Sequence, residues 1–164
     1  MIEEGEIAPD FTLPIARGEA YNDVSEFTVS NALDTGPVVL AFFPAAFTSG
    51  CTEELCTFRD SLSVFEDLDA SVYGVSTDLP FAQNVFIQQE GLTFPLLSDF
   101  EHEAIRRYDV VREDFYDVMF VAERSVFVVD EGRIVYRWRE EDESTDFERL
   151  VGEIRDVLET NIER

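Results

Sequence analysis

The chain has 164 residues, of which 45% are apolar and 15 are phenylalanine. This length suits one domain with a sizeable core, and the apolar content favours a packed globular protein over a disordered one. The 36 acidic residues outnumber the 12 basic residues, and the net charge of −24 argues against nucleic-acid binding because such a surface repels phosphate backbones. We therefore predict a single domain over residues 1–164.

The sequence shows no segment typical of membrane insertion or secretion. The longest apolar run, Val38 to Phe47, is interrupted by Pro44 and falls well short of the roughly 20 residues that cross a bilayer. The N-terminal segment MIEEGEIAPD is acidic, whereas a secretory signal begins with basic residues and continues with apolar ones. We expect a soluble, cytoplasmic protein that does not associate with membranes.

The charge has an unusual composition, because all 12 basic residues are arginine and the chain contains no lysine. A docking surface for a cationic partner would explain the acidity, but the acidic residues are spread along the whole chain. A salt-rich cytoplasm explains this spread better, since the Debye length falls to about 3 Å at 1 M salt and the charges no longer repel one another. The composition resembles that of halophilic archaeal proteins.

The apolar pattern predicts strands and helices that alternate along the chain. In chain order we predict a strand within residues 8–14, a strand within 36–44, a helix over 51–68, a strand over 71–78, a helix over 80–90, a strand over 94–99, a helix over 101–108, two strands over 125–130 and 133–138, and a final helix after 145. This order indicates an α/β fold with a mixed central β-sheet flanked by helices.

Local signals support these boundaries. Pro80 is suited to the start of a helix and Gly91 to its end. The dipeptide Glu131-Gly132 predicts a tight turn between the two strands of a hairpin. Residues 145–148, Thr-Asp-Phe-Glu, form a capping box that would open the last helix, and apolar residues at helical spacing follow it.

The two cysteines, Cys51 and Cys56, carry the most specific chemical signal. Cys51 falls where the buried strand gives way to the helix. At such a junction the free backbone N–H groups and the positive end of the helix dipole favour a thiolate over a thiol. A thiolate in this position is a nucleophile or a redox centre.

Three residues complete a candidate site around Cys51. The Thr48 hydroxyl and the backbone amides after it could hold a small oxygen ligand against the sulfur, and Pro44 would shield the pocket from water. A guanidinium would stabilise the negative charge of the attacking and leaving atoms. Arg124 is a candidate because it begins a strand, and strand ends gather around sites in α/β sheets.

These residues resemble the peroxiredoxin family. PAAFTSGC, residues 44–51, has the family spacing of Pro, Thr and Cys, and TSGCTEELCTFRD is similar to the bacterioferritin-comigratory, or Q-type, subfamily. The segments FFP, TFPLLSDF and ERSVFVVD are more similar to the one-cysteine, E-type alkyl hydroperoxide reductases, and APDFTLP is a usual opening of the family. The resemblance covers nearly the whole chain and implies a thioredoxin-like fold.

The resemblance also implies roles for the site residues. Cys51 would be the peroxidatic cysteine, Thr48 its hydrogen-bonding partner, Arg124 the activating guanidinium and Pro44 the shield. Glu54 matches an acidic position that orients the arginine. The implied activity is reduction of hydrogen peroxide and organic hydroperoxides, with electrons from a thioredoxin-like or low-molecular-weight thiol donor. The resemblance is also compatible with a homodimer.

Cys56 leaves two mechanisms open. A cysteine five residues after the peroxidatic one is the resolving cysteine of Q-type enzymes and would form a disulfide with Cys51. The E-type enzymes lack it and rely on an external thiol. Five residues of helix separate Cα atoms by roughly 8 to 9 Å, whereas cysteines that form a disulfide lie within about 7 Å. A disulfide would therefore require the first turns of the helix to unwind.

Other functions fit the sequence less well. A dithiol oxidoreductase would have two residues between its cysteines, and a non-catalytic binding or holdase protein would not need the Pro44, Thr48 and Cys51 set. Zinc is disfavoured because the two cysteines and His102 make only three poorly spaced ligands. We expect neither a metal nor another cofactor.

Overall fold

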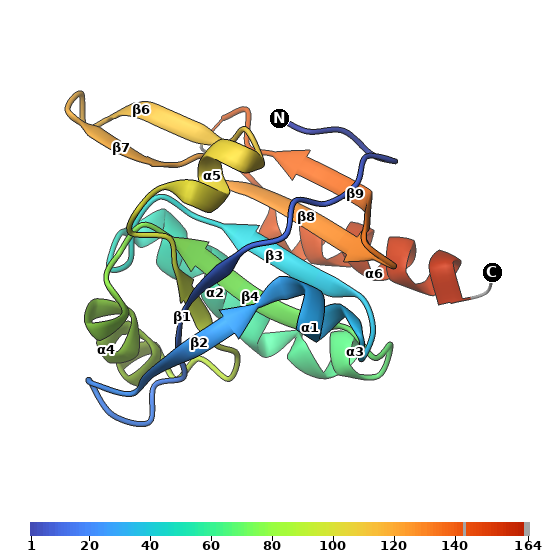
Figure 1. Cartoon of the computed structure of the whole chain (residues 1–164), viewed down its shortest axis with the longest axis horizontal. Coiled ribbons are helices and arrows are strands. Elements are labelled where there is room, and N and C mark those ends of the chain that lie inside the picture. The colour runs from blue at the N-terminus through green and yellow to red at the C-terminus, as the bar shows by residue number, and fades with distance from the viewer. Residues whose placement is uncertain (143, 163–164) are drawn as a thin grey trace.

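The structure is a computed structural model that describes residues 1–142 and 144–162. Figure 1 shows one seven-stranded sheet with helices on both sides and a separate two-stranded hairpin, all within these residues. The strands are β1 (Thr12–Ala16), β2 (Val24–Thr28), β3 (Val38–Phe42), β4 (Ser71–Ser76), β5 (Leu96–Ser98), β6 (Val111–Phe115), β7 (Met119–Ala122), β8 (Ser125–Asp130) and β9 (Arg133–Arg139). The helices are α1 (Val29–Leu33), α2 (Ser49–Asp60), α3 (Leu62–Glu66), α4 (Pro80–Glu90), α5 (Glu103–Arg107) and α6 (Phe147–Ile162).

The large sheet is mixed, as the sequence predicted. Its strand order is β2-β1-β5-β4-β3-β8-β9. The central strands β3, β4 and β5 are parallel, while β8 is antiparallel to β3 and to β9. The parallel strands end at one edge of the sheet, and the loops that leave this edge hold the candidate site.

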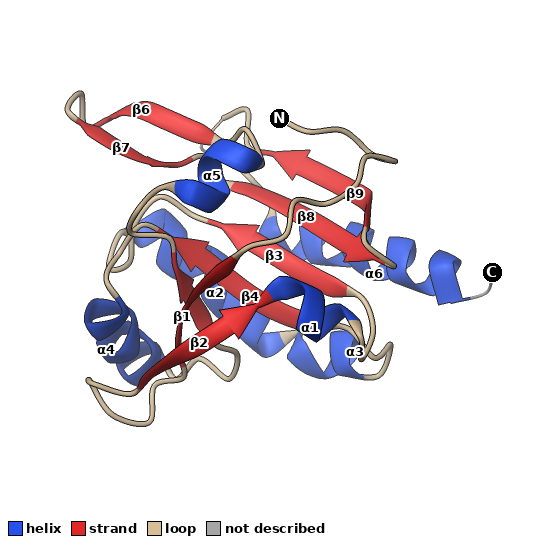
Figure 2. Ribbon diagram, in the orientation of Figure 1, coloured by secondary structure: helices blue, strands red, loops and turns tan. Residues whose placement is uncertain are grey.

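Strand β3 shows how the sheet divides the core into two layers. Val39, Ala41 and Phe43 belong to the cluster that packs against α2, α3, α4 and α6. Val38, Leu40 and Phe42 belong to the opposite cluster, against which α1 and α5 pack. Figure 2 shows these two groups of helices on either side of the red strands. Because neighbouring side chains of a strand point to opposite faces, a continuously apolar β3 requires cover on both sides.

Several predicted boundaries are confirmed. Helix α4 begins at Pro80 and ends at Glu90, and Gly91 follows in the left-handed conformation with φ of 62°. Residues Glu131 and Gly132 have φ of 52° and 81° and connect β8 to β9. Positive φ at both central residues is what a tight hairpin turn requires, and glycine adopts it without steric cost.

Other expectations require correction. The long helix over 51–68 is two helices, α2 and α3, separated at Ser61, and the first strand is shifted to Thr12–Ala16. The last helix is capped by Asp146, whose Oδ1 accepts the backbone N–H of Arg149 at 3.1 Å. The Thr145 hydroxyl instead donates to Glu140, 2.9 Å away, so the expected capping box does not form.

Four elements were not predicted: β2, α1, β6 and β7. Strands β2 and β6 are largely exposed and rich in polar residues, so they lack the apolar pattern of the other strands. None of the helices in the described part of the chain combines the length and the apolar character that a membrane crossing requires.

Candidate active site

Cys51 lies at the start of α2, directly after the loop that leaves β3. Thr48 is the N-cap residue, with the extended backbone that this position requires, and Cys51 is the third residue of the helix. The Cys51 side chain is fully buried. The free N–H groups at this helix end and the helix dipole stabilise negative charge on the sulfur.

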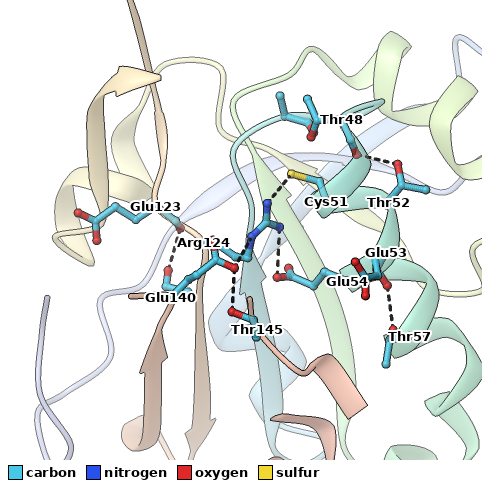
Figure 3. A network of polar contacts seen from close by, with 12 residues as sticks. Thr48, Cys51, Thr52, Glu53, Glu54, Thr57, Glu123, Arg124, Glu140 and Thr145 are labelled. Atoms are coloured by element: carbon cyan, nitrogen blue, oxygen red, sulfur yellow. Dashed lines mark hydrogen bonds and ion pairs between the residues drawn. The ribbon is translucent and has the colours of Figure 1, made fainter. Parts of the chain in front are cut away.

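Arg124 reaches Cys51 from the connection between β7 and β8. Its Nη2 atom lies 3.2 Å from the Cys51 Sγ atom (Figure 3). Gly50 leaves room for this approach, because a Cβ atom at that position would lie 3.2 Å from the same nitrogen. The structure thus brings together two sequence-predicted residues, and the lack of a side chain at position 50 permits their contact.

Two carboxylates hold the other nitrogens of the Arg124 guanidinium. The Oε2 atom of Glu54 lies 3.4 Å from Nη1, and the Oε2 atom of Glu140 lies 3.3 Å from Nε. Glu140 in turn accepts a hydrogen bond from the Thr145 hydroxyl. The ring of Phe147 faces the same guanidinium, 5.9 Å from its central carbon. The three guanidinium nitrogens therefore have three different partners: Nη2 contacts Cys51, Nη1 contacts Glu54 and Nε contacts Glu140.

Burial changes the charge balance of this cluster. It raises the pKa of Glu54 from 4.5 to about 8, although the neighbouring Arg124 acts in the opposite direction. The second oxygen of Glu54 is buried without a hydrogen-bond partner in the described residues, which fits a carboxyl group that keeps its proton near neutral pH. Burial alone would lower the pKa of Arg124, but Glu54, Cys51 and Glu140 together raise it.

Thr48 and Pro44 both belong to the segment between β3 and the first turn of α2. Figure 3 shows Thr48 next to Cys51, but its hydroxyl donates a hydrogen bond to the carbonyl oxygen of Ala45, 2.8 Å away. The hydroxyl proton of Thr48 is therefore used in a hydrogen bond to Ala45, and the hydroxyl oxygen can still accept a hydrogen bond. Pro44 is buried two residues after β3 ends.

Cys56 lies farther along α2, and both cysteines are free thiols. Its Sγ atom is 3.8 Å from Oε2 of Glu90, at the end of α4. Burial raises the pKa of the Cys56 thiol, and the negative charge of Glu90 adds to this effect while Arg59 opposes it. The raised pKa favours the protonated thiol of Cys56, which takes no part in the polar cluster around Arg124.

An open cleft of about 560 Å³ leads to the guanidinium of Arg124. Its lining residues come from the start of α2, the β6–β7 hairpin, the β7–β8 connection, the segment after β9 and the start of α6. They are Thr48, Ser49, Gly50, Glu53, Arg112, Phe115, Tyr116, Arg124, Glu140 and Phe147. A small oxygen ligand can enter here and meet the arginine, the threonine and the helix N-terminus together.

Glu140 and the β6–β7 hairpin are parts of the site that sequence reasoning missed. The carboxylate of Glu140 belongs to an acidic run, Glu140 to Glu143, and nothing in that run distinguishes it. The first strand of the hairpin, β6, is largely exposed and has charged residues at its centre, so no clear apolar alternation marks the hairpin as structured. Among the described residues, no group of three or more His, Cys, Asp and Glu side chains could hold a metal ion.

Comparison with known proteins shows the family of the chain. Residues 5–137 match the model of the AhpC/TSA family. Peroxiredoxin Bcp of Bacillus subtilis is 38% identical over 141 residues, which cover 84% of this chain and 85% of that protein. Alkyl hydroperoxide reductase E of Mycobacterium tuberculosis is 38% identical over 137 residues, which cover 82% of this chain and 83% of that protein.

Solved structures share the fold over almost the whole chain. Peroxidoxin BcpB from Mycobacterium tuberculosis matches with a TM-score of 0.83 at 30% identity and covers 98% of both chains. Peroxiredoxin Q from Xanthomonas campestris matches with a TM-score of 0.74 at 26% identity and covers 90% of both chains. The expected thioredoxin-like fold is thereby confirmed. The chain belongs to the AhpC/TSA family, and it is a peroxiredoxin, an enzyme that reduces peroxides with thiols.

Proposed function

We propose that Cys51 is the peroxidatic cysteine of this enzyme and that it reduces hydrogen peroxide and organic hydroperoxides. The 3.2 Å contact between Cys51 Sγ and Arg124 Nη2 is the observation that supports this role best. A guanidinium in contact with a buried sulfur stabilises the thiolate before the reaction and the negative charge of the departing oxygen during it.

The chemical step is a displacement at oxygen. The thiolate attacks the hydroxyl oxygen of the peroxide, so a sulfur–oxygen bond forms and the oxygen–oxygen bond breaks. The electron pair of the broken bond leaves with the other oxygen, which takes up a proton and departs as water or an alcohol. The sulfur is oxidised to a sulfenic acid, and the peroxide is reduced. Thr48 and Arg124 orient the peroxide, Glu54 orients Arg124, and Pro44 limits the access of water.

We further propose that Cys56 resolves the sulfenic acid. Its thiol attacks the Cys51 sulfur, a disulfide forms, and the sulfenic oxygen leaves as water after taking up a proton. In one continuous helix the Cα atoms of these two cysteines are roughly 8 to 9 Å apart, beyond the span of about 7 Å for a disulfide. Helix α2 must therefore unwind locally after oxidation, and a thioredoxin-like or low-molecular-weight thiol then reduces the disulfide.

Oxidation with one equivalent of peroxide tests both roles. Wild-type protein should lose both free thiols quickly and gain the mass of an internal disulfide, while Cys51→Ser should lose neither. The Cys56→Ser variant should stop at a sulfenic or sulfinic acid. A wild-type protein that also stops there would assign resolution to an external thiol. A Cys51 no more reactive than free cysteine would contradict the peroxidatic assignment.

A homodimer is the assembly that the surface favours. Large apolar side chains are exposed on α4, in the loops that precede α2, α4 and α5, and on the β6–β7 hairpin, in a protein with a strongly acidic composition. They are Phe47, Leu79, Phe81, Val85, Phe100, Tyr116, Val118, Met119 and Phe120. Sedimentation at about 0.1 M and about 1 M salt should show a dimer that is stronger at high salt, because screening reduces repulsion between the acidic chains. A monomer at both concentrations would contradict this proposal.

A further inference from the structure

One peptide group in the active-site loop is held at both ends. The carbonyl oxygen of Ala45 accepts the hydrogen bond of the Thr48 hydroxyl, at 2.8 Å. The N–H of the same peptide group belongs to Ala46 and donates to the Oδ2 atom of Asp78, at 2.9 Å. The peptide group between Ala45 and Ala46 therefore connects Asp78 to Thr48, a residue that lines the cleft.

Asp78 is itself fixed by the end of strand β4 and its neighbours. The Ser76 hydroxyl donates to the same Oδ2 atom at 2.7 Å, and the buried amide of Gln83 donates to Ser76 at 3.0 Å. The backbone carbonyl of Asp78 accepts the Ser98 hydroxyl at 2.6 Å. These contacts come from β4, α4 and β5, so the carboxylate has a defined position in the fold.

The direction of the Thr48 proton matters for the reaction. A hydroxyl has one proton, and a Thr48 hydroxyl that donates to Ala45 has only lone pairs left for a ligand in the cleft. Such a group accepts the O–H of a peroxide and turns the hydroxyl oxygen toward the sulfur. A carboxylate that accepts the N–H of the intervening peptide polarises this peptide and strengthens its carbonyl as an acceptor.

We propose that Asp78 is a positioning residue, which acts through the Ala45–Ala46 peptide group to keep the Thr48 hydroxyl as an acceptor for the O–H of the peroxide. The inference rests on the proposed roles of Cys51 and Thr48, and it adds a residue from a different loop, the one between β4 and α4. In this proposal Asp78 contributes to the reaction of Cys51 with peroxide, and it does not contribute to the formation of the Cys51 thiolate.

Two reactions of Cys51 separate these contributions. In Asp78→Ala, oxidation by hydrogen peroxide should slow by about tenfold, because the acceptor is no longer held in its productive direction. Alkylation by iodoacetamide should keep the wild-type rate, since it needs the thiolate and no acceptor for an O–H. Asp78→Asn places an amide oxygen where Oδ2 lies, and it should restore oxidation to within about threefold of wild type.

A matched control and a double variant complete the test. Asp10 also accepts a backbone N–H from a residue distant in the sequence, Ser30 in the first turn of α1, at 3.0 Å, and Asp10→Ala should leave both rates unchanged. Thr48→Val should slow oxidation by about a hundredfold, and adding Asp78→Ala should slow it no further, because both changes remove the same acceptor.

Three results would overturn the proposal for Asp78. They are a wild-type rate of oxidation in Asp78→Ala, an equal fall in oxidation and alkylation, or effects of Thr48→Val and Asp78→Ala that multiply. The first would show that the contact has no kinetic effect, the second a general loosening of the loop, and the third an action that does not pass through Thr48. A wild-type Cys51 that is unreactive toward peroxide would instead contradict the proposed function.

Discussion

The Nη2 atom of Arg124 lies 3.2 Å from the Sγ atom of Cys51, although 73 positions separate the two residues in the sequence. The same guanidinium contacts Glu54 through Nη1 and Glu140 through Nε. The three nitrogens of the planar guanidinium thus contact three different side chains, an arrangement that the single ammonium group of a lysine cannot reproduce. The arrangement makes the shape of the guanidinium as important as its charge.

Substitution of Arg124 by lysine should therefore reduce peroxide reduction strongly. We expect Arg124→Lys to lower the rate constant for oxidation of Cys51 by about a hundredfold, because a positioned donor to the reacting oxygens is lost. Rapid-mixing measurements of sulfenic acid formation would show this. Arg139→Lys serves as the control, since Arg139 pairs at 3.6 Å with Glu123 outside the cleft and should not affect the rate. A wild-type rate in Arg124→Lys would mean that a point charge is sufficient.

Glu54 should make the stability of the fold depend on pH. Its pKa is about 8 in the folded protein and 4.5 in the absence of burial, so the folded chain keeps a proton that the unfolded chain loses between these values. The contribution of Glu54 to the free energy of unfolding is therefore fully present below about pH 4.5. It falls as the pH rises toward 8, with a slope of up to about 1.4 kcal/mol per pH unit.

Urea unfolding of wild type and Glu54→Gln at several pH values would isolate this contribution. Other carboxylates affect both proteins equally, so the difference between the two free energies of unfolding reports position 54. The variant should become relatively more stable as the pH rises from 5 to about 8, because glutamine has no proton to lose. Parallel curves for the two proteins would show that Glu54 titrates normally.

The contacts between α2 and α4 should control how fast Cys56 reacts. Arg59 donates a hydrogen bond to the carbonyl oxygen of Glu90, and Cys56 lies 3.8 Å from the carboxylate of the same residue. Both contacts hold the folded form of α2, which must unwind before a disulfide can form. Arg59→Ala should therefore speed disulfide formation after oxidation by about three- to tenfold, as expected for the loss of a charge-assisted hydrogen bond.

Intact mass spectrometry of samples quenched after peroxide addition would follow this step. With excess peroxide, Arg59→Ala should also accumulate less sulfinic acid than wild type, because the disulfide forms before a second peroxide reacts. Arg155→Ala is a suitable control, since Arg155 is an exposed residue of α6 that pairs with its neighbour Asp156. An unchanged or slower rate in Arg59→Ala would argue that unwinding of α2 does not limit resolution.

The net charge of −24 should make the protein more stable in salt. Exposed carboxylates repel one another in dilute buffer, and screening at about 1 M potassium chloride should raise the midpoint of thermal unfolding by at least about 5 °C. Sucrose favours the compact state without screening charge, so it distinguishes the two effects. A midpoint that rises with sucrose and not with potassium chloride would contradict the expectation.

Elements with a strong local pattern could be predicted from the sequence. Strand β3 is a continuous apolar run, and α4 lies between Pro80 and Gly91, so the residues themselves mark where these elements begin and end. Strand β6 lacks such a pattern because its central residues are charged and exposed, and β7 is a run of only four residues, of which two are exposed and two are buried. The cap of α6 was misassigned because Thr145 and Asp146 are both good N-cap residues and only their hydrogen bonds distinguish them.

The sequence by itself determined the position of Cys51 and its nearest partners. The spacing of Pro44, Thr48 and Cys51 places the thiol at a helix N-terminus, a relationship within one turn of chain that local geometry dictates. Only the tertiary structure decided which distant groups meet this thiol. Glu140 and Asp78 carry no local signal, because their positions follow from the order of the strands and from long-range pairing in the sheet.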